Sequence, residues 1–398
     1  MIELSGNFMK ILFVVESYYP SLNGVANVVR YLAEGLAKKG YHVSVATRLL
    51  DSKSRNDVVN GVEIHRFDVN FNLLKFPSGE KRQYLDFVLN SDVDCVILEC
   101  TECVTTDLVI PHLSKLKGKK ILHVHGCSGL VNSSLFKKCD VFLHSIGHTY
   151  NKIKAYWYFN CWLKKYVSLF NKAIVISEAD NGKPYLEKYL GKNVLVLGNA
   201  ADEMFFESEH IQHDMLKRLA GLKSSKYLLS CANYSVVKDQ KTMIEQFYKA
   251  RTEDCALVCI GSQANDYFGE CQVLMKKMEE KYGHKEVLLL HHIDRNLFPS
   301  IVAESMIYLV TSRREQYSIS IIEAMSQGIP FISTNVGNAS ILPGGLTIDH
   351  VSTMHKTIES LMKDKQLYQD LSSKGKEFAY INCQKKIAVD KLNQIINL

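Results

Sequence analysis

Short apolar runs alternate with longer amphipathic segments along this chain, and this alternation restricts the possible folds more than any other feature. The run ILFVV at 11–15 precedes GVANVVRYLAEGLAKKG at 24–40, and YHVSVAT at 41–47 follows. Within the middle segment, apolar residues recur at helical spacing, at Val25, Val28, Val29, Leu32 and Leu36. A strand, a helix and a second strand in this order predict a βαβ unit and a parallel sheet.

The alternation occurs in two successive series. Further strands of the first series are expected at 62–67, 94–100, 120–126, 140–145, 172–177 and 193–199. Those of the second series are expected at 226–233, 256–262, 286–292, 306–312 and 330–336. A chain of 398 residues is too long for one compact core. We therefore predict an α/β protein of two doubly wound, Rossmann-like domains, with a ligand site at the carboxyl ends of the strands, in the cleft between the domains.

The composition is that of a globular protein, with 46% hydrophobic and 23% charged residues. Residues 1–195 hold 25 Lys and Arg against 18 Asp and Glu, a balance of +7, and the remainder holds 23 against 24. The basic excess indicates that the first half faces an anionic partner. No apolar run approaches the roughly 18 residues that span a bilayer. The first residues lack a basic and apolar leader, so we expect a cytoplasmic protein.

The eleven cysteines are read as reduced, mostly buried thiols. Cys100 and Cys103 form a CxxC, and His123, His125 and Cys127 follow. A zinc or redox site is one interpretation of this group. Because no second CxxC completes a tetrad, we prefer small apolar residues at the end of a strand, and we expect no metal.

The stretch SRREQYSISIIEAMSQGIP at 312–330 places a loop between a strand and a helix that ends at Gly328. Backbone amides near Ser318 and Ile319, at the start of the helix, suit a phosphate, and Ser318 is a candidate N-cap. The carboxylate of Glu323 matches the two hydroxyls of a ribose, and Glu315 can approach a sugar beyond the phosphates. The alternative is an ordinary solvated helix with a loop acid.

The same stretch resembles the signature of the family 4 glycosyltransferases of GT-B fold, E-G-F-G-L-x-x-x-E-A-M-A-x-G-x-P. The resemblance places Glu315 against the transferred sugar and Glu323 on the nucleotide ribose. It assigns donor binding to the positions between the two glutamates, namely Gln316, Tyr317, Ser318 and Ile319. The chain departs from the family in having Gln316 and Ser318 for glycines and Tyr317 for phenylalanine.

Two segments of the first half are also similar to this family. YYPSLNGVANVVRYLAEGLAKKGYHVSVAT resembles its opening glycine-rich loop and helix, which places Gly24 near the donor phosphates. A tight turn is the alternative role for this glycine. KILHVHG at 120–126 resembles a strand ending T-x-H-G, which places His125 against the transferred sugar as a catalytic residue. We expect His123 to point to the opposite side of that strand. A structural hydrogen bond is the alternative for His125.

The segment CANYSVVKDQKTMIEQF is similar to the family's G-R-L-x-x-x-K motif. Lys238 then neutralises the donor diphosphate, and Asn233 occupies the position of the family arginine. Gly261 and Ser262, after ALVCI, match another donor-side loop. A departing diphosphate needs its developing negative charge balanced. Because the family arginine is absent, we expect Lys238 to supply more of the positive charge.

The resemblance implies a GT-B protein with an acceptor-side domain at 1–198, a nucleotide-sugar domain at 199–378 and a helix at 379–398 that crosses back to the first domain. It implies a retaining transferase with a UDP- or GDP-linked donor and a saccharide or lipid-linked acceptor, in cell-surface polysaccharide synthesis. Nucleic acid is not an expected partner. Two alternatives are a sugar-nucleotide epimerase of the same fold and a non-catalytic, sugar-binding partner of another transferase.

The segment NKIKAYWYFNCWLKKYVSLFNK at 151–172 has five lysines, no acidic residue and both tryptophans of the chain. A helix with aromatic and cationic faces can lie in an anionic membrane interface. The alternative is a helix whose aromatic residues face the core while its lysines face water. Membrane contact by 151–172 would place the protein at the inner face of the cell membrane.

Overall fold

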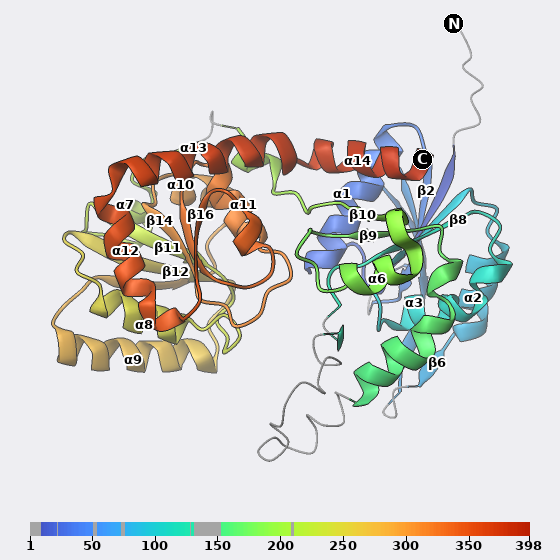
Figure 1. Ribbon diagram of the computed structural model, residues 1–398, viewed down its shortest axis with the longest axis horizontal. Helices are drawn as coiled ribbons and strands as arrows, with labels where there is room; N and C mark the ends of the chain where they lie inside the picture. Colours follow the sequence, from blue (N-terminus) through green and yellow to red (C-terminus); the bar gives the residue numbers. More distant parts are fainter. Residues whose placement is uncertain are drawn as a thin grey trace, which may run out of the picture. The chain divides into compact units, whose positions relative to one another are not determined.

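The chain folds into two units, shown in Figure 1. The computed structural model describes residues 9–21, 23–50, 54–72, 76–127, 129–130, 153–207 and 211–398. Unit 1 consists of Met1–Gly198 and Ala388–Leu398, and unit 2 of Asn199–Ile387. The strand expected at 140–145 and the first two residues of 151–172 lie outside the described residues.

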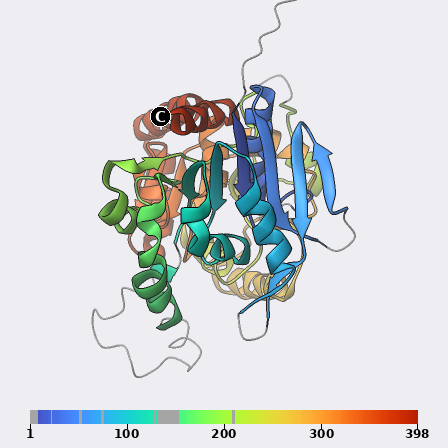
Figure 2. The same ribbon diagram turned by 90° about the vertical axis from the view of Figure 1, so that its right-hand side faces the viewer.

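Unit 1 is built on a mainly parallel sheet with the strand order β10-β9-β8-β7-β1-β2-β4-β3 (Figure 2). Its strands are β1 Lys10–Val14, β2 His42–Arg48, β3 Asn56–Val59, β4 Val62–Phe67, β7 Cys95–Glu99, β8 Lys119–His123, β9 Lys172–Val175 and β10 Val194–Val196. A separate antiparallel pair consists of β5 Val69–Phe71 and β6 Pro77–Gly79. The helices are α1 Gly24–Lys38, α2 Lys81–Asn90, α3 Val104–Val109, α6 Lys183–Leu190 and α14 Lys385–Asn397.

Helix α1 begins at a side-chain cap, because Asn23 Oδ1 accepts a hydrogen bond from the amide of Ala26 at 2.9 Å. Its apolar stripe is buried, as the helical spacing predicted. Helix α14 packs on α1, and a Cβ added at Gly35 would lie 2.4 Å from Val389 Cγ2. Tyr41 also donates to Asn393 Oδ1 at 2.5 Å. These contacts attach the end of the chain to unit 1.

Unit 2 has a parallel sheet with the strand order β13-β12-β11-β14-β15-β16. Its strands are β11 Lys226–Cys231, β12 Cys255–Gly261, β13 Val287–His291, β14 Ile307–Val310, β15 Phe331–Thr334 and β16 Gly345–Ile348. Its helices are α7 Met215–Ala220, α8 Gln240–Lys249, α9 Asp266–Tyr282, α10 Phe298–Ala303, α11 Ile319–Ser326, α12 Met354–Lys363 and α13 Lys365–Asn382.

Both faces of the unit 2 sheet are buried. Tyr227 and Leu229 of β11 belong to one apolar cluster, and Leu228 between them belongs to another. Strands buried on both faces read as continuous apolar runs, which is why the sequence showed them so clearly. The predicted α/β class with parallel sheets is confirmed.

Residues 153–172 do not form one regular helix. A short helical turn at 153–157 leads into a π-helical turn at Tyr158–Trp162 and two 3₁₀ turns at Leu163–Lys165 and Val167–Leu169. Within the described residues, we find no helix that is both long and apolar enough to cross a membrane.

Candidate functional site

In unit 1, three titratable side chains meet at the carboxyl ends of β7 and β8. Glu99 ends β7 and His123 ends β8, and the two are register partners in the parallel ladder. Glu99 Oε2 lies 2.8 Å from His125 Nε2 and 3.0 Å from His123 Nδ1. The side chains of Glu99 and His123 are buried, and that of His125 is 7% exposed. Glu99 was not among the residues expected from the sequence, although its position at the end of a predicted strand could have identified it.

The expected orientation of His123 is wrong. Residues two apart in an extended segment share a face, so His123 and His125 point to the same side. Their ring centroids lie 4.3 Å apart, and both rings contact Glu99. The sequence therefore places two imidazoles, not one, beside the buried carboxylate.

This cluster has a defined charge pattern. Burial by itself would raise the pKa of Glu99, but the two imidazoles lower that pKa to about 2. Burial and the neighbouring His123 lower the pKa of His125, and Glu99 only partly offsets this. Glu99 is thus ionised at neutral pH, and burial disfavours the charged form of His125.

Within the described residues, Glu99, His123 and His125 are also the group that can hold a metal ion, because their ligand atoms all lie within 4.8 Å of one another. Two histidines and one carboxylate are ligands that suit zinc or ferrous iron. The CxxC cysteines do not belong to this group.

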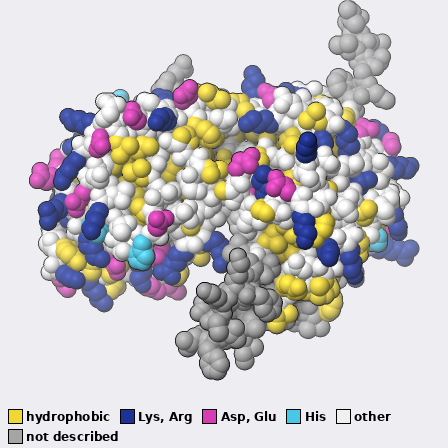
Figure 3. Space-filling view, viewed as in Figure 1, with side chains coloured by type: hydrophobic (Ala, Val, Ile, Leu, Met, Phe, Trp, Pro, Cys, Tyr) yellow, Lys and Arg dark blue, Asp and Glu magenta, His cyan; other side chains and the backbone are white. Residues whose placement is uncertain are grey.

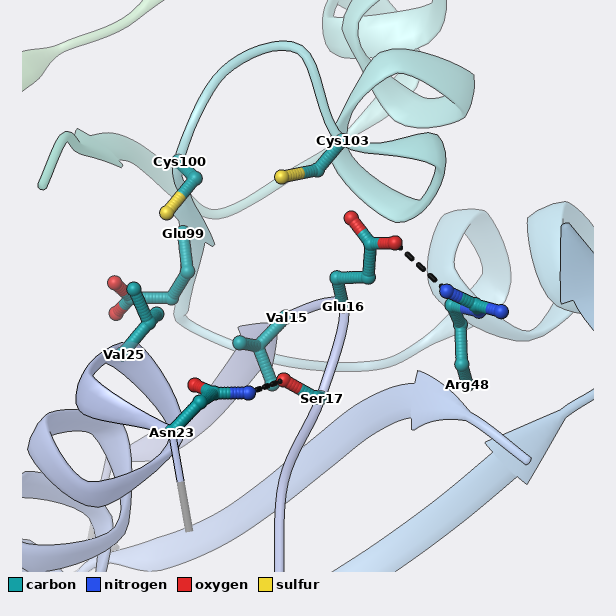
Figure 4. Close-up of a pocket in the computed structure, with 9 residues that line it drawn as sticks. All are labelled: Val15, Glu16, Ser17, Asn23, Val25, Arg48, Glu99, Cys100 and Cys103. Carbon is teal, nitrogen blue, oxygen red and sulfur yellow. Dashed lines mark hydrogen bonds and ion pairs between the residues drawn. The ribbon is translucent and has the colours of Figure 1, made fainter. Parts of the chain in front are cut away.

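A cavity of about 410 Å³ opens beside this cluster (Figure 4). Its lining residues are Val15, Glu16, Ser17, Asn23, Val25, Arg48, Glu99, Cys100 and Cys103. Arg48 Nη1 pairs with Glu16 Oε1 at 2.8 Å, so the cavity carries both charges. Cys100, which lines the cavity, has a left-handed backbone with φ of 66°, a strained conformation for a residue other than glycine.

Gly24 lies at the first position of α1, next to this cavity. A Cβ added there would meet no atom within 4 Å, and the backbone of Gly24 is not left-handed. The tight-turn role is therefore not needed to explain this glycine. The open space in front of it leaves its backbone accessible to a ligand.

In unit 2, Lys238 and Glu315 form an ion pair at the carboxyl end of β14. Ser312 Oγ donates to Glu315 Oε1 at 2.9 Å, and Thr311 Oγ1 donates to the carbonyl of Lys238 at 2.9 Å. The lysine side chain is 30% exposed and the glutamate side chain 14%. Both also line a small hollow together with Ser318 and neighbouring residues. The pair is held in place yet open to a ligand.

The start of α11 has Ser318 at the expected N-cap position but without the side-chain hydrogen bond of a cap. The hydroxyl of Ser318 lies 3.2 Å from Ser320 Oγ instead. The amide of Ser318 donates to Asn338 Oδ1 at 3.0 Å. That amide is therefore already engaged, and Ile319 begins the helix behind it.

The two positions before Ser318 differ from each other in their surroundings. Tyr317 packs against the apolar core of unit 2. The carbonyl of Gln316 lies against Gly337, where a Cβ would come within 2.9 Å and the φ is +57°. Glycine at 337 therefore permits the loop of Gln316 to approach closely.

Glu323 is buried in α11 and pairs with Arg295, which follows β13. Burial raises the pKa of Glu323, and the guanidinium of Arg295 partly offsets that shift. The guanidinium also lies 4.9 Å from the ring centroids of Phe205 and Phe298. Arg295 was not expected from the sequence, because no local pattern marks an arginine as the partner of a distant glutamate.

The remaining donor-side candidates form a second, separate set of contacts. Asn233 Oδ1 accepts from the amide of Ser262 at 3.3 Å. Gly261 faces the ring of Tyr234, and a Cβ there would lie 2.5 Å from that ring. Arg313, in the loop after β14, pairs with Asp239 at 2.9 Å.

Comparison with known proteins finds similarity to sugar-transferring enzymes. Residues 215–378 match the family model described as Glycosyl transferases group 1. An N-acetyl-alpha-D-glucosaminyl L-malate synthase from Bacillus anthracis is 22% identical over 379 residues, which covers 91% of this chain and 90% of that protein. A probable sucrose-phosphate synthase from Thermosipho melanesiensis is 27% identical over 168 residues, 40% of each chain.

Solved structures share the fold. A glycosyltransferase from Rickettsia africae superimposes with a TM-score of 0.72 at 14% identity, over 98% of both chains. The Anabaena protein HepE, solved with UDP and glucose, gives a TM-score of 0.66 at 14% identity, over 98% of this chain and 99% of that one. These similarities and the two parallel sheets show the predicted GT-B fold.

Proposed function

We propose that this chain is a group 1 glycosyltransferase, which the match over residues 215–378 supports, and that it transfers a sugar from a nucleotide-sugar donor to a saccharide or lipid-linked acceptor with retention of anomeric configuration. The observation that carries the proposal is the ion pair of Lys238 and Glu315 at the carboxyl end of β14. A parallel α/β sheet binds ligands at that edge.

The chemistry of transfer requires charge balance on the departing diphosphate. In the proposed mechanism, Lys238 supplies this positive charge and Glu315 contacts the transferred sugar. Glu323, fixed by Arg295, accepts hydrogen bonds from the ribose hydroxyls. For His125 of unit 1 the proposed role is that of a sugar contact, and the leaving diphosphate takes the acceptor's proton.

For the donor we propose a UDP-linked sugar, with GDP as the second choice. The support is indirect, since HepE, of the same fold, was solved with UDP and with UDP-glucose. The proposed setting is cell-surface polysaccharide or glycan synthesis at the cytoplasmic face of the membrane.

A thermal-shift panel of UDP, GDP, ADP and their sugar conjugates tests the donor, because a ligand of the native state raises the melting temperature. We expect stabilisation by one nucleotide series, and release of that nucleoside diphosphate when acceptor is added. Lys238→Ala should weaken both responses. The matched control is Lys241→Ala, which removes a lysine that pairs with Glu270 on the surface.

Stabilisation by no nucleotide, or equal responses of Lys238→Ala and wild type, would contradict the proposal. Conversion of the sugar nucleotide to an isomer, without free nucleotide, would identify an epimerase instead.

We also propose peripheral membrane contact through residues 151–172, of which the structure describes 153–172. Ile153, Tyr156 and Trp157 are 64%, 45% and 55% exposed, and Lys164 and Lys165 are exposed on the following turns. Trp162, by contrast, packs against the core of unit 1. Figure 3 shows hydrophobic side chains, with Lys and Arg side chains near them, on the lower side of unit 1 in that view. Exposed aromatic and basic side chains together suit an anionic lipid surface.

Pelleting with vesicles that contain phosphatidylglycerol tests this contact. The double variant Lys164→Gln/Lys165→Gln should pellet several-fold less than wild type at low salt. Lys276→Gln/Lys277→Gln is the control, since it removes two adjacent exposed lysines of α9 in unit 2. Equal pelleting of the two double variants would count against this surface.

A further inference from the structure

We propose that Glu99, His123 and His125 bind one divalent transition-metal ion, zinc or ferrous iron, with open coordination positions that are reached from the cavity of unit 1. The inference goes beyond the proposed transfer and does not depend on it. The sequence led us to expect no metal because no second CxxC completes a tetrad, but the cysteines do not belong to this group of ligands.

Three buried polar atoms of this cluster lack a hydrogen-bond partner. Among the residues that the structure describes, neither ring nitrogen of His123 makes a hydrogen bond, and neither does Oε1 of Glu99. The side chain of His123 is 1% exposed, and that of Glu99 is completely buried. Buried polar atoms are nearly always paired, so unpaired ones call for an explanation such as a bound ion. A hydrogen bond between Glu99 and His125 leaves these three atoms unexplained.

The spacing of the ligand atoms fits a single ion. Glu99 Oε2 lies 2.8 Å from His125 Nε2 and 3.0 Å from His123 Nδ1, and the ligand atoms all lie within 4.8 Å of one another. Nitrogen and oxygen ligands lie about 2.1 Å from zinc, so two ligands at right angles around one ion are about 3.0 Å apart. Two histidines and one carboxylate on one side of an ion leave positions open on its other side.

The backbone holds these ligands in place, and the cavity gives access to them. The carbonyl of Glu99 accepts from Thr106 Oγ1 at 2.8 Å, and the amide of Cys100 donates to the carbonyl of His123 at 2.8 Å. Glu99 also lines the cavity of about 410 Å³, so an ion on its carboxylate is reached from that cavity (Figure 4). An open position can take an oxygen of water or of a substrate, and the ion polarises that oxygen. Under the proposed function, His125 then contacts the sugar through the ion.

The first experiment titrates the untagged full chain, stripped with EDTA, with Zn²⁺ in competition with a chromogenic chelator. We expect one saturable site per chain, and elemental analysis of the unstripped protein identifies the native ion. His123→Gln should weaken the site by more than about 100-fold, since loss of a mere hydrogen-bond partner of a ligand already costs about 10- to 100-fold. His65→Gln is the matched control, because His65 also lies beside a carboxylate, that of Glu63 at 3.9 Å, but outside the group of three.

The second experiment tests the open positions on the wild type alone, so that it does not depend on the folding of a variant. Co²⁺ takes the place of zinc or ferrous iron, and its visible absorption reports the number and kind of ligands. We expect the weak bands of an ion with more than four ligands, as right-angled protein ligands imply. Acetate or azide should shift these bands by entering an open position. Circular dichroism verifies that His123→Gln is folded in the first experiment.

The absence of saturable Zn²⁺ and Co²⁺ binding by the wild type would overturn the proposal, and a buried water would then be the partner of the unpaired atoms. Equal affinity of folded His123→Gln and the wild type would also overturn it, because the ion would lie elsewhere. Cobalt bands that neither acetate nor azide shifts would contradict the open positions. A protein that binds the metal as expected but transfers no sugar would contradict the proposed function and leave the metal site standing.

Discussion

Lys238 and Glu315 lie 77 residues apart in the sequence, yet their side chains form an ion pair. Glu315 thus engages the cation that the proposed mechanism assigns to the diphosphate. A donor must therefore compete with Glu315 for Lys238, or share it.

This competition gives the first prediction. Glu315→Ala should lower turnover by about 100-fold, a loss in the range seen for removal of one transition-state contact. It should leave nucleoside diphosphate binding unchanged or tighter, because Lys238 is released from its partner. Calorimetric titration with UDP and steady-state kinetics measure the two effects. A parallel loss of binding and turnover would mean that Glu315 only maintains the fold.

The second prediction concerns Arg295 and Glu323. Arg295→Ala leaves a buried carboxylate without its partner and should destabilise the protein by about 1–3 kcal/mol, as for an unsatisfied buried polar group. The double variant Arg295→Ala/Glu323→Gln should recover part of this loss, because no charge remains to be balanced. Urea unfolding of the wild type, Arg295→Ala, Glu323→Gln and the double variant gives the coupling free energy between the two residues. Strict additivity would show that the pair is not a stabilising unit.

The third prediction is a pH effect. Burial raises the pKa of Asp107 to about 7, with the hydroxyl of Tyr158, which donates at 2.5 Å, opposing that shift. Between its ordinary pKa and 7, the folded state binds a proton that the unfolded state has lost, so stability falls as pH rises. The free energy of unfolding falls by about 1.4 kcal/mol per pH unit when one proton is involved. Relative to Asp107→Asn, the wild type should lose about 2.5 kcal/mol of unfolding free energy between pH 5 and pH 8. A pH-independent difference in unfolding free energy would contradict the raised pKa.

The fourth prediction tests the attachment of α14. Gly35→Ala places a methyl group against the stiff side chain of Val389 and should destabilise unit 1 by about 1–3 kcal/mol, the range for overpacking. In a Val389→Ala background, Gly35→Ala should instead stabilise the protein. Space is then available for the methyl group, and alanine favours a helix over glycine by roughly 1 kcal/mol. Thermal unfolding of the cycle measures both values. The same sign in both backgrounds would exclude a direct clash.

Local patterns accounted for most strands because each is an apolar run bounded by turn residues. One missed element carried a readable signal. Asn60 and Gly61 connect β3 and β4 with φ of 51° and 81°, and Asn-Gly between apolar residues is a strong hairpin signal. The short β16, with its sequence GLTI, carried no such signal. Its strand character comes from pairing with β15.

The sequence by itself determined the α/β class, most strands, and the candidate acids Glu315 and Glu323, because periodicity and turn residues act over short distances. The tertiary structure decided the partners. It paired Lys238 with Glu315, Arg295 with Glu323, and two histidines with Glu99. Such pairs form where strands far apart in the chain end at the same edge of a sheet. No local pattern in the sequence encodes which distant side chain will balance a buried charge.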